Sequence, residues 1–268
     1  MNKLQKIIIA SLVSISVFSW LLSIKQPDMM NIMITYNPVL IGLFTASWTA
    51  GMAAMMFPAI VPMVLLYSKL LTNEQSILST ETIQPKFSTF KVVLFVGMYL
   101  VIWSLTGLSL LLIWSIPMDS IVTFHNAKNL GVIFGSILII SGLYQFTSLK
   151  NKCIGYCESP FTFFMRRWRN GVVGALKMGA YHGLYCLGCC WPYFLIMVAL
   201  GWMNLVWMGL FAAIIFGEKI WPRGIWIARS FGIILIILGI LSSLGLIVLY
   251  DSMIAMNLQD GDKMVMAM

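Results

Sequence analysis

The chain has 268 residues, of which 60% are hydrophobic and only 10% are charged. Soluble domains usually carry about 25% charged residues, so this composition excludes an ordinary soluble protein. The formal net charge of +8 does not indicate a nucleic-acid partner, because the basic residues gather at the ends of apolar segments. The sequence therefore predicts an all-α, polytopic transmembrane helical bundle whose surroundings are membrane lipid.

Seven apolar runs have about the length that a transmembrane helix needs. We expect these helices over residues 6–24, 38–67, 90–114, 130–148, 172–200, 203–218 and 225–249. The first run is too long for the apolar part of a signal peptide, so we predict an uncleaved span. Pro58 and Pro62 should bend the second helix, and Pro192 should leave the carbonyl of Gly188 without its helical partner. Residues 1–268 are interpreted as one integral membrane domain.

The lysines and arginines predict the orientation of this domain. With a cytoplasmic N-terminus, 14 of the 17 basic residues fall on the inside and 3 on the outside. Residues 149–171 then form a cytoplasmic loop containing cysteines and arginines, in which the aromatic and arginine part is expected to be a short helix on an anionic lipid surface. Residues 251–268 form a short external acidic tail. The expected location is the cell membrane.

A histidine and three cysteines fall together in the fifth apolar run. At about 100° per residue on a helix, Cys186 and Cys189 lie within about 40° of His182, and Cys190 lies at the edge of the same stripe. An imidazole with two or three thiolates is suited to Cu(I) or Zn(II), so we interpret these residues as metal ligands. The alternative is that the cysteines are small apolar residues that serve close helix packing.

Methionines of the second apolar run are expected at the same depth as these cysteines. Met52, Met55 and Met56 could supply thioether ligands to complete the site, or could line a contact between two helices. Two or three soft ligands suffice for Cu(I), whereas Zn(II) usually takes four. The ligand set therefore favours Cu(I), with Zn(II) as the alternative metal.

Two further cysteines and one charged pair complete the candidate groups. Cys153 and Cys157 fall in the predicted cytoplasmic loop and could form a metal or redox pair there. Glu218 and Lys219 end the sixth helix, where we expect a pair that reaches toward the membrane boundary. The sequence shows no serine–histidine–acid set, phosphate loop or paired intramembrane carboxylates, so a catalytic role is not favoured.

The sequence resembles a known family over about residues 40–240. The resemblance rests on Gly142-Leu143-Tyr144-Gln145, Leu149-Lys150, Cys153, Cys157, Ser159-Pro160, Gly174-Ala175-Leu176, His182-Gly183, Tyr185-Cys186, Gly188-Cys189-Cys190-Trp191, Met203-Asn204, Trp207-Met208 and Glu218-Lys219, and on Met55-Met56-x-Pro58 with Pro62-Met63. These motifs are similar to those of the predicted metal-binding integral membrane proteins, a prokaryotic family. Pro192-Tyr193 and Glu158 depart from its pattern. The resemblance implies a metal site at the histidine and cysteines.

Three functional hypotheses follow from these patterns. The first is a membrane protein that delivers, stores or passes Cu(I) through an intramembrane His/Cys site. The second is a non-catalytic accessory subunit of a larger membrane copper-enzyme complex, with the cysteines as packing residues. The third is a membrane thiol–disulfide oxidoreductase that uses Cys186 and Cys189, since their spacing also fits a redox pair.

Overall fold

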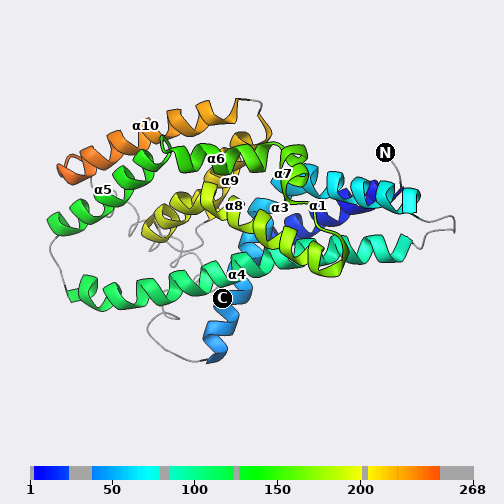
Figure 1. Cartoon of the computed structure of the whole chain (residues 1–268). Coiled ribbons are helices and arrows are strands. Elements are labelled where there is room, and N and C mark those ends of the chain that lie inside the picture. The colour runs from blue at the N-terminus through cyan, green and yellow to red at the C-terminus, as the bar shows by residue number, and fades with distance from the viewer. Residues whose placement is uncertain are drawn as a thin grey trace.

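The computed structural model describes residues 3–23, 38–78, 85–123, 127–200, 205–221 and 223–247, and the regular structure within them is entirely helical. Figure 1 shows the helices, which are α1 (Lys3–Ser23), α3 (Pro38–Leu78), α4 (Pro85–Thr123), α5 (Ala127–Tyr144), α6 (Ser148–Glu158), α7 (Pro160–Arg167), α8 (Gly171–Leu200), α9 (Leu205–Ile220) and α10 (Gly224–Ser243). The predicted all-α class is confirmed.

The number of helices differs from the predicted seven. Each predicted apolar run has a helix, but the described residues hold nine helices in all. The two additional helices, α6 and α7, lie in the predicted cytoplasmic segment, where only one short helix was expected, at the aromatic and arginine part that α7 now occupies. By length and composition, four helical stretches could cross a membrane: 5–23, 38–72, 88–113 and 224–243. A fifth span is obtained if α5 and α6, which meet at a 64° bend, cross together. Several helices are thus long and apolar enough for a membrane location.

The segment expected to be a cytoplasmic loop is helical for identifiable local reasons. The hydroxyl of Thr147 accepts a hydrogen bond from the backbone N–H of Lys150 and caps the first turn of α6. Pro160 lies in the first turn of α7, where its missing N–H removes no helical hydrogen bond. Cys153 and Ile154 of α6 are buried. α6 is polar on average, but its buried face is apolar and packs on α8.

Glycines allow two pairs of helices to approach closely. In α5 and α10, a Cβ atom at Gly142 would lie 2.6 Å from the carbonyl oxygen of Gly232, and one at Gly239 would lie 2.7 Å from that of Gly135. In the same way, a Cβ at Gly179 of α8 would lie 2.4 Å from the carbonyl oxygen of Phe95 in α4. Small residues at such contacts let helix backbones meet. Figure 1 shows α5 and α10 side by side at the upper left, with α4 along the lower edge.

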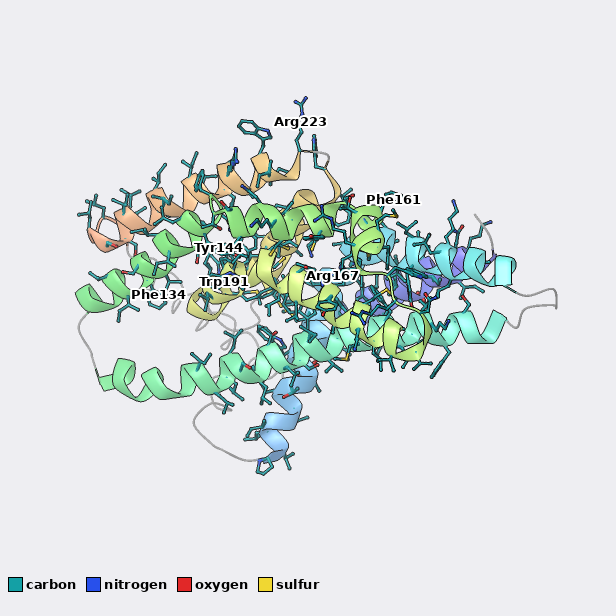
Figure 2. The ribbon with its side chains drawn as sticks, in the orientation of Figure 1. Phe134, Tyr144, Phe161, Arg167, Trp191 and Arg223 are labelled. Carbon is teal, nitrogen blue, oxygen red and sulfur yellow. The ribbon has the colours of Figure 1, made fainter. Side chains whose placement is uncertain are left out.

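The outer helix faces carry large apolar side chains. Met165, Val206 and Trp226 are each more than half exposed, at 71%, 74% and 62%. Exposed apolar residues of this number and size suit a lipid environment better than water. In Figure 2 the side chains of Phe161 and Arg223 also point away from the helices. The predicted acidic tail, residues 251–268, lies outside the described residues.

Candidate metal site

The cysteine-rich part of α8 is held by side chains from neighbouring helices. Pro192 lies inside α8, and the carbonyl oxygen of Gly188, four residues earlier, accepts a hydrogen bond of 2.5 Å from the hydroxyl of Tyr144. The ring of Tyr144 also packs edge-on against Trp191, and Figure 2 labels the two residues close together. The prediction that this carbonyl lacks a helical partner is confirmed, and α5 supplies the replacement donor.

A buried ion pair fixes the next carbonyl of α8. The ammonium of Lys150 in α6 donates to the carbonyl oxygen of Cys189 at 2.6 Å and to a carboxylate oxygen of Glu218 in α9 at 2.9 Å. The second carboxylate oxygen of Glu218 accepts a hydrogen bond from the hydroxyl of Tyr193. Both charged side chains are fully buried, so each needs the other and these extra hydrogen bonds. The network joins α6, α8 and α9 beside the cysteines.

The five cysteines gather around one stretch of α8. The sulfur of Cys189 lies 3.4 Å from that of Cys190 and 3.8 Å from that of Cys157 in α6. Cys153 is adjacent as well, since a Cβ atom at Gly188 would lie 2.8 Å from its sulfur. All five are free thiols. The structure thus brings the two cysteines expected at a separate loop site against the cysteines of α8.

The thiol of Cys186 meets a cation in the bundle interior. The ammonium of Lys219 in α9 donates to its sulfur at 2.8 Å and lies 3.8 Å from the thioether sulfur of Met56 in α3. The hydroxyl of Tyr99 in α4 is 3.2 Å from the same Cys186 sulfur. Cys186, Tyr99 and Met56 are completely buried, and Lys219 is 7% exposed. Four helices therefore converge on a sulfur-lined space that holds one positive charge.

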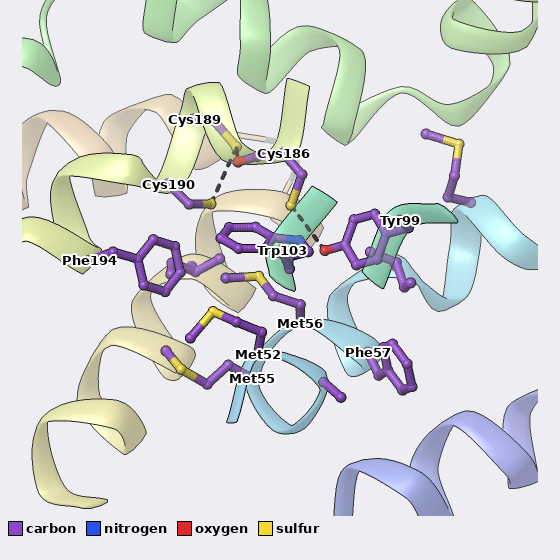
Figure 3. Packing of buried hydrophobic residues seen from close by; sticks show 14 of the residues in the cluster. Met52, Met55, Met56, Phe57, Tyr99, Trp103, Cys186, Cys189, Cys190 and Phe194 are labelled. Atoms are coloured by element: carbon purple, nitrogen blue, oxygen red, sulfur yellow. Dashed lines mark hydrogen bonds between the residues drawn. The ribbon is translucent and has the colours of Figure 1, made fainter. Parts of the chain in front are cut away.

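The three methionines predicted as additional ligands lie on the α3 side of this space. Met52, Met55 and Met56 are all buried, and Figure 3 shows them on α3 across from the cysteines of α8. Of the three, Met56 has a sulfur within 4 Å of the ammonium that contacts Cys186. Met56 and Cys186 thus contact the same ammonium, that of Lys219 in α9.

His182 lies one turn before Cys186 in an aromatic cage. Its ring stacks on Phe95 and Tyr99, with centroid distances of 5.9 and 5.4 Å, and meets Phe163 edge-on. It is 2% exposed, and neither ring nitrogen has a hydrogen-bond partner. A buried imidazole without hydrogen-bond partners is energetically costly, which sets His182 apart from an ordinary core residue.

The thiols contact one another rather than surrounding a common centre. Within the part of the chain that the structure describes, no three His, Cys, Asp or Glu side chains are arranged to hold a metal ion as they stand. Copper coordination at these residues would therefore need small side-chain rotations and displacement of existing hydrogen bonds. The donor set itself, several thiols with a thioether and an imidazole, remains chemically suited to a soft metal.

Sequence reasoning missed the charged residues of this region. Glu218 and Lys219 were expected to form one pair at a membrane boundary, but both are buried and they have different partners: Lys150 for the carboxylate and Cys186 for the ammonium. Neighbouring residues on a helix point about 100° apart, so adjacent charges at the end of an apolar run were a signal for two separate contacts. Nothing in the sequence indicated Tyr99.

Comparison with known proteins identifies the family. Neither a curated protein nor a solved structure matches the chain. One family model, described as "PpoB2: Copper chaperone", matches residues 45–242, a range that includes all five cysteines and α4 to α9 but not α1. That match covers well over half of the chain, close to the span expected for the family-like core. The chain therefore belongs to the PpoB2 copper chaperone family.

Proposed function

We propose that this protein is an integral membrane copper chaperone that binds Cu(I) between α8 and α3. The observation that carries the proposal is the convergence of the Cys186 thiol, the Cys189–Cys190 pair and the Met56 thioether in a buried space. Cys186 and Cys189 act as thiolate ligands, and Met56 supplies a neutral sulfur. Cu(I) needs only two or three soft ligands, so this set is sufficient for it and poor for Zn(II).

His182 is the neutral nitrogen ligand of the proposed site. Its nitrogens have no other partner, and Tyr99 contacts both its ring and the Cys186 sulfur. Rotation of the imidazole within its aromatic cage brings it toward the next turn of α8. Cys190, Met52 and Met55 are additional sulfur ligands that bind the metal transiently while it enters or leaves the site.

Cys157 provides a path between the buried thiols and the protein surface. It is half-buried, whereas Cys186, Cys189 and Cys190 are fully buried, and its sulfur lies 3.8 Å from that of Cys189. Cu(I) passes readily between thiolates because it accepts a third ligand before it releases the first. We place copper transfer along Cys157, Cys189 and Cys186, with Cys153 beside the path at Gly188.

The test is the copper content of the reduced, copper-replete protein and three variants. Wild type should carry about one Cu(I) per chain, and Cys186→Ser and Cys189→Ser should each lose it, since serine is a poor ligand for a soft metal. The matched control, Cys157→Ser, should keep the copper at equilibrium but load it more slowly from a Cu(I) complex. Elemental analysis after gel filtration measures content, and absorbance of a chromogenic chelator measures loading.

Equal copper in wild type and in both core variants, or none in any of them, would contradict the proposal. The cysteines would then be packing residues, and a structural role in a larger membrane complex would be the better interpretation. Co-purification with large partner subunits would support that role directly.

A second candidate function has one observation in its favour. The Cys157 and Cys189 sulfurs are 3.8 Å apart on two different helices, a distance that a small movement converts to a disulfide. An oxidoreductase would form this disulfide while it reduces a partner disulfide, and would break it while it oxidises a partner dithiol. Mass spectrometry of alkylated protein, isolated with and without a mild disulfide oxidant, distinguishes the two functions, because a copper chaperone binds metal only with these thiols reduced.

A further inference from the structure

One buried cation of the described residues lies beside the cysteines. Four charged side chains are buried in the described part of the chain: Lys91, Lys150, Glu218 and Lys219. Lys150 and Glu218 neutralise each other across 2.9 Å. Lys91 lies about two turns before Tyr99 on α4, away from the cysteines. Lys219 therefore places an ammonium beside the Cys186 sulfur, and no carboxylate of the described residues pairs with it.

The position of this charge is fixed by its contacts. The ammonium lies 2.8 Å from the Cys186 sulfur and 3.8 Å from the Met56 sulfur, so it borders the place where a metal bound to those atoms would be. Tyr99 and Trp103, which pack beside these groups, are themselves fully buried. Charges in such an environment interact strongly over a few ångströms.

We propose that Lys219 makes this site select a monovalent over a divalent metal ion. The inference rests on the proposed function, because it assumes that Cys186 and Cys189 bind a metal. Coulomb repulsion between the ammonium and the metal grows with the metal charge, so Zn(II) is repelled twice as strongly as Cu(I) at the same position. Lys219 is thus a specificity-determining residue and not a ligand.

The charge balance of the loaded site leads to the same preference. Two thiolates carry two negative charges, which Lys219 and one Cu(I) ion neutralise together. A Zn(II) ion on the same ligands would leave one uncompensated positive charge in an apolar interior, which is costly. The neutral ligands, Met56 and His182, do not alter this balance.

The experiment compares Cu(I) and Zn(II) affinities in the wild type and in Lys219 variants. Each metal is supplied with a competing chromogenic chelator, and the quantity of interest is the ratio of the two dissociation constants. Lys219→Met removes the charge and keeps much of the side-chain length, and should shift the ratio toward Zn(II) by on the order of tenfold to a hundredfold. Lys219→Gln is a second neutral variant for the case that the first does not fold.

Two controls separate charge from packing. Lys219→Arg keeps the charge and should preserve the preference of the wild type for Cu(I). Tyr99→Phe removes the hydroxyl contact of the Cys186 sulfur without a change of charge, and should leave the ratio within about threefold of the wild-type value.

The outcomes test this inference separately from the proposed function. A ratio in the neutral variants that is unchanged, or that moves toward Cu(I), would overturn the role of Lys219 while leaving the copper site intact. A shift of equal size in Lys219→Arg would assign the effect to packing and would also overturn it. Absence of any metal binding by the wild type would instead refute the proposed site, and the selectivity inference with it.

Discussion

Proline residues inside the long helices show how single residues organise this bundle. Pro58 cannot donate to the carbonyl of Ala54, and the hydroxyl of Ser16 in α1 donates to that oxygen at 2.7 Å. The hydroxyl of Tyr144 likewise donates to the carbonyl oxygen of Gly188, which lacks its helical donor because of Pro192. A buried carbonyl must find a donor, so each proline creates a contact point for a neighbouring helix.

Loss of the Tyr144 hydroxyl should therefore weaken the protein. In Tyr144→Phe the partly buried Gly188 carbonyl loses its donor, which should cost about 1–3 kcal/mol. Thermal unfolding in detergent, followed by circular dichroism, measures the loss. The matched control is Tyr156→Phe, whose hydroxyl accepts a hydrogen bond from Arg166 at an exposed position and should matter by about 0.5 kcal/mol or less. Similar losses in the two variants would show that the carbonyl contact has no special role.

Some residue-level features could be read from the sequence and others could not. The carbonyl freed by Pro192 follows from the chemistry of proline, and a stripe of His182, Cys186 and Cys189 follows from helix periodicity. The donors that complete the site, Tyr144, Lys150 and Lys219, come from three other helices. Their positions depend on how the helices pack, which periodicity within one segment does not determine.

At the level of helices, glycine contacts determine which pairs lie together. Gly135 and Gly142 are seven residues apart on α5, as are Gly232 and Gly239 on α10, so each pair lies on one helix face. The close approach of the backbones at these positions aligns α5, and hence Tyr144 at its end, relative to α8 and α10.

A methyl group at one of these contacts should separate the two helices. In Gly142→Ala the new Cβ would lie 2.6 Å from the Gly232 carbonyl oxygen, a backbone atom that cannot move aside alone. We expect a loss of stability of about 1–3 kcal/mol. The control is Gly97→Ala in α4, where no atom lies within 4 Å and the substitution should be neutral or stabilising by up to about 1 kcal/mol. Equal unfolding temperatures for the two variants would refute the close-packing argument.

Helices were predicted correctly from the sequence where a long apolar run was present. They were missed where helix formation depends on packing against other helices. Each apolar run is helical, as its length and composition indicated. The failure lies at residues 148–158, where lysines and an asparagine suggested a loop, whereas the short helix expected at the following aromatic and arginine part is present as α7. α6 is helical because its cap, its buried Cys153 and its tie through Lys150 to Glu218 stabilise it, and these last two depend on α8 and α9.

At the level of the whole molecule, the buried lysines modify the argument for orientation. Three of the basic residues counted as cytoplasmic, Lys91, Lys150 and Lys219, are buried and therefore cannot serve as surface charges at a membrane boundary. Removing them leaves 11 basic residues on the predicted inside and 3 on the outside. The bias remains strong, so the prediction of a cytoplasmic N-terminus is retained.

The number of spans determines on which side of the membrane the C-terminus lies. Four spans would leave both termini on the same side of the membrane, whereas five, with α5 and α6 crossing as one bent span, or seven would put them on opposite sides. The charge bias, counted over seven spans, predicts opposite sides with an external C-terminus. A reporter enzyme active only in the cytoplasm, fused after Met268, should be inactive, and one active only outside should be active at the same position. The control fusion is the same pair of reporters placed before Met1, which should give the reverse result. Identical results at the two ends would support four spans and would refute both the bent α5–α6 span and the positive-inside assignment of this chain.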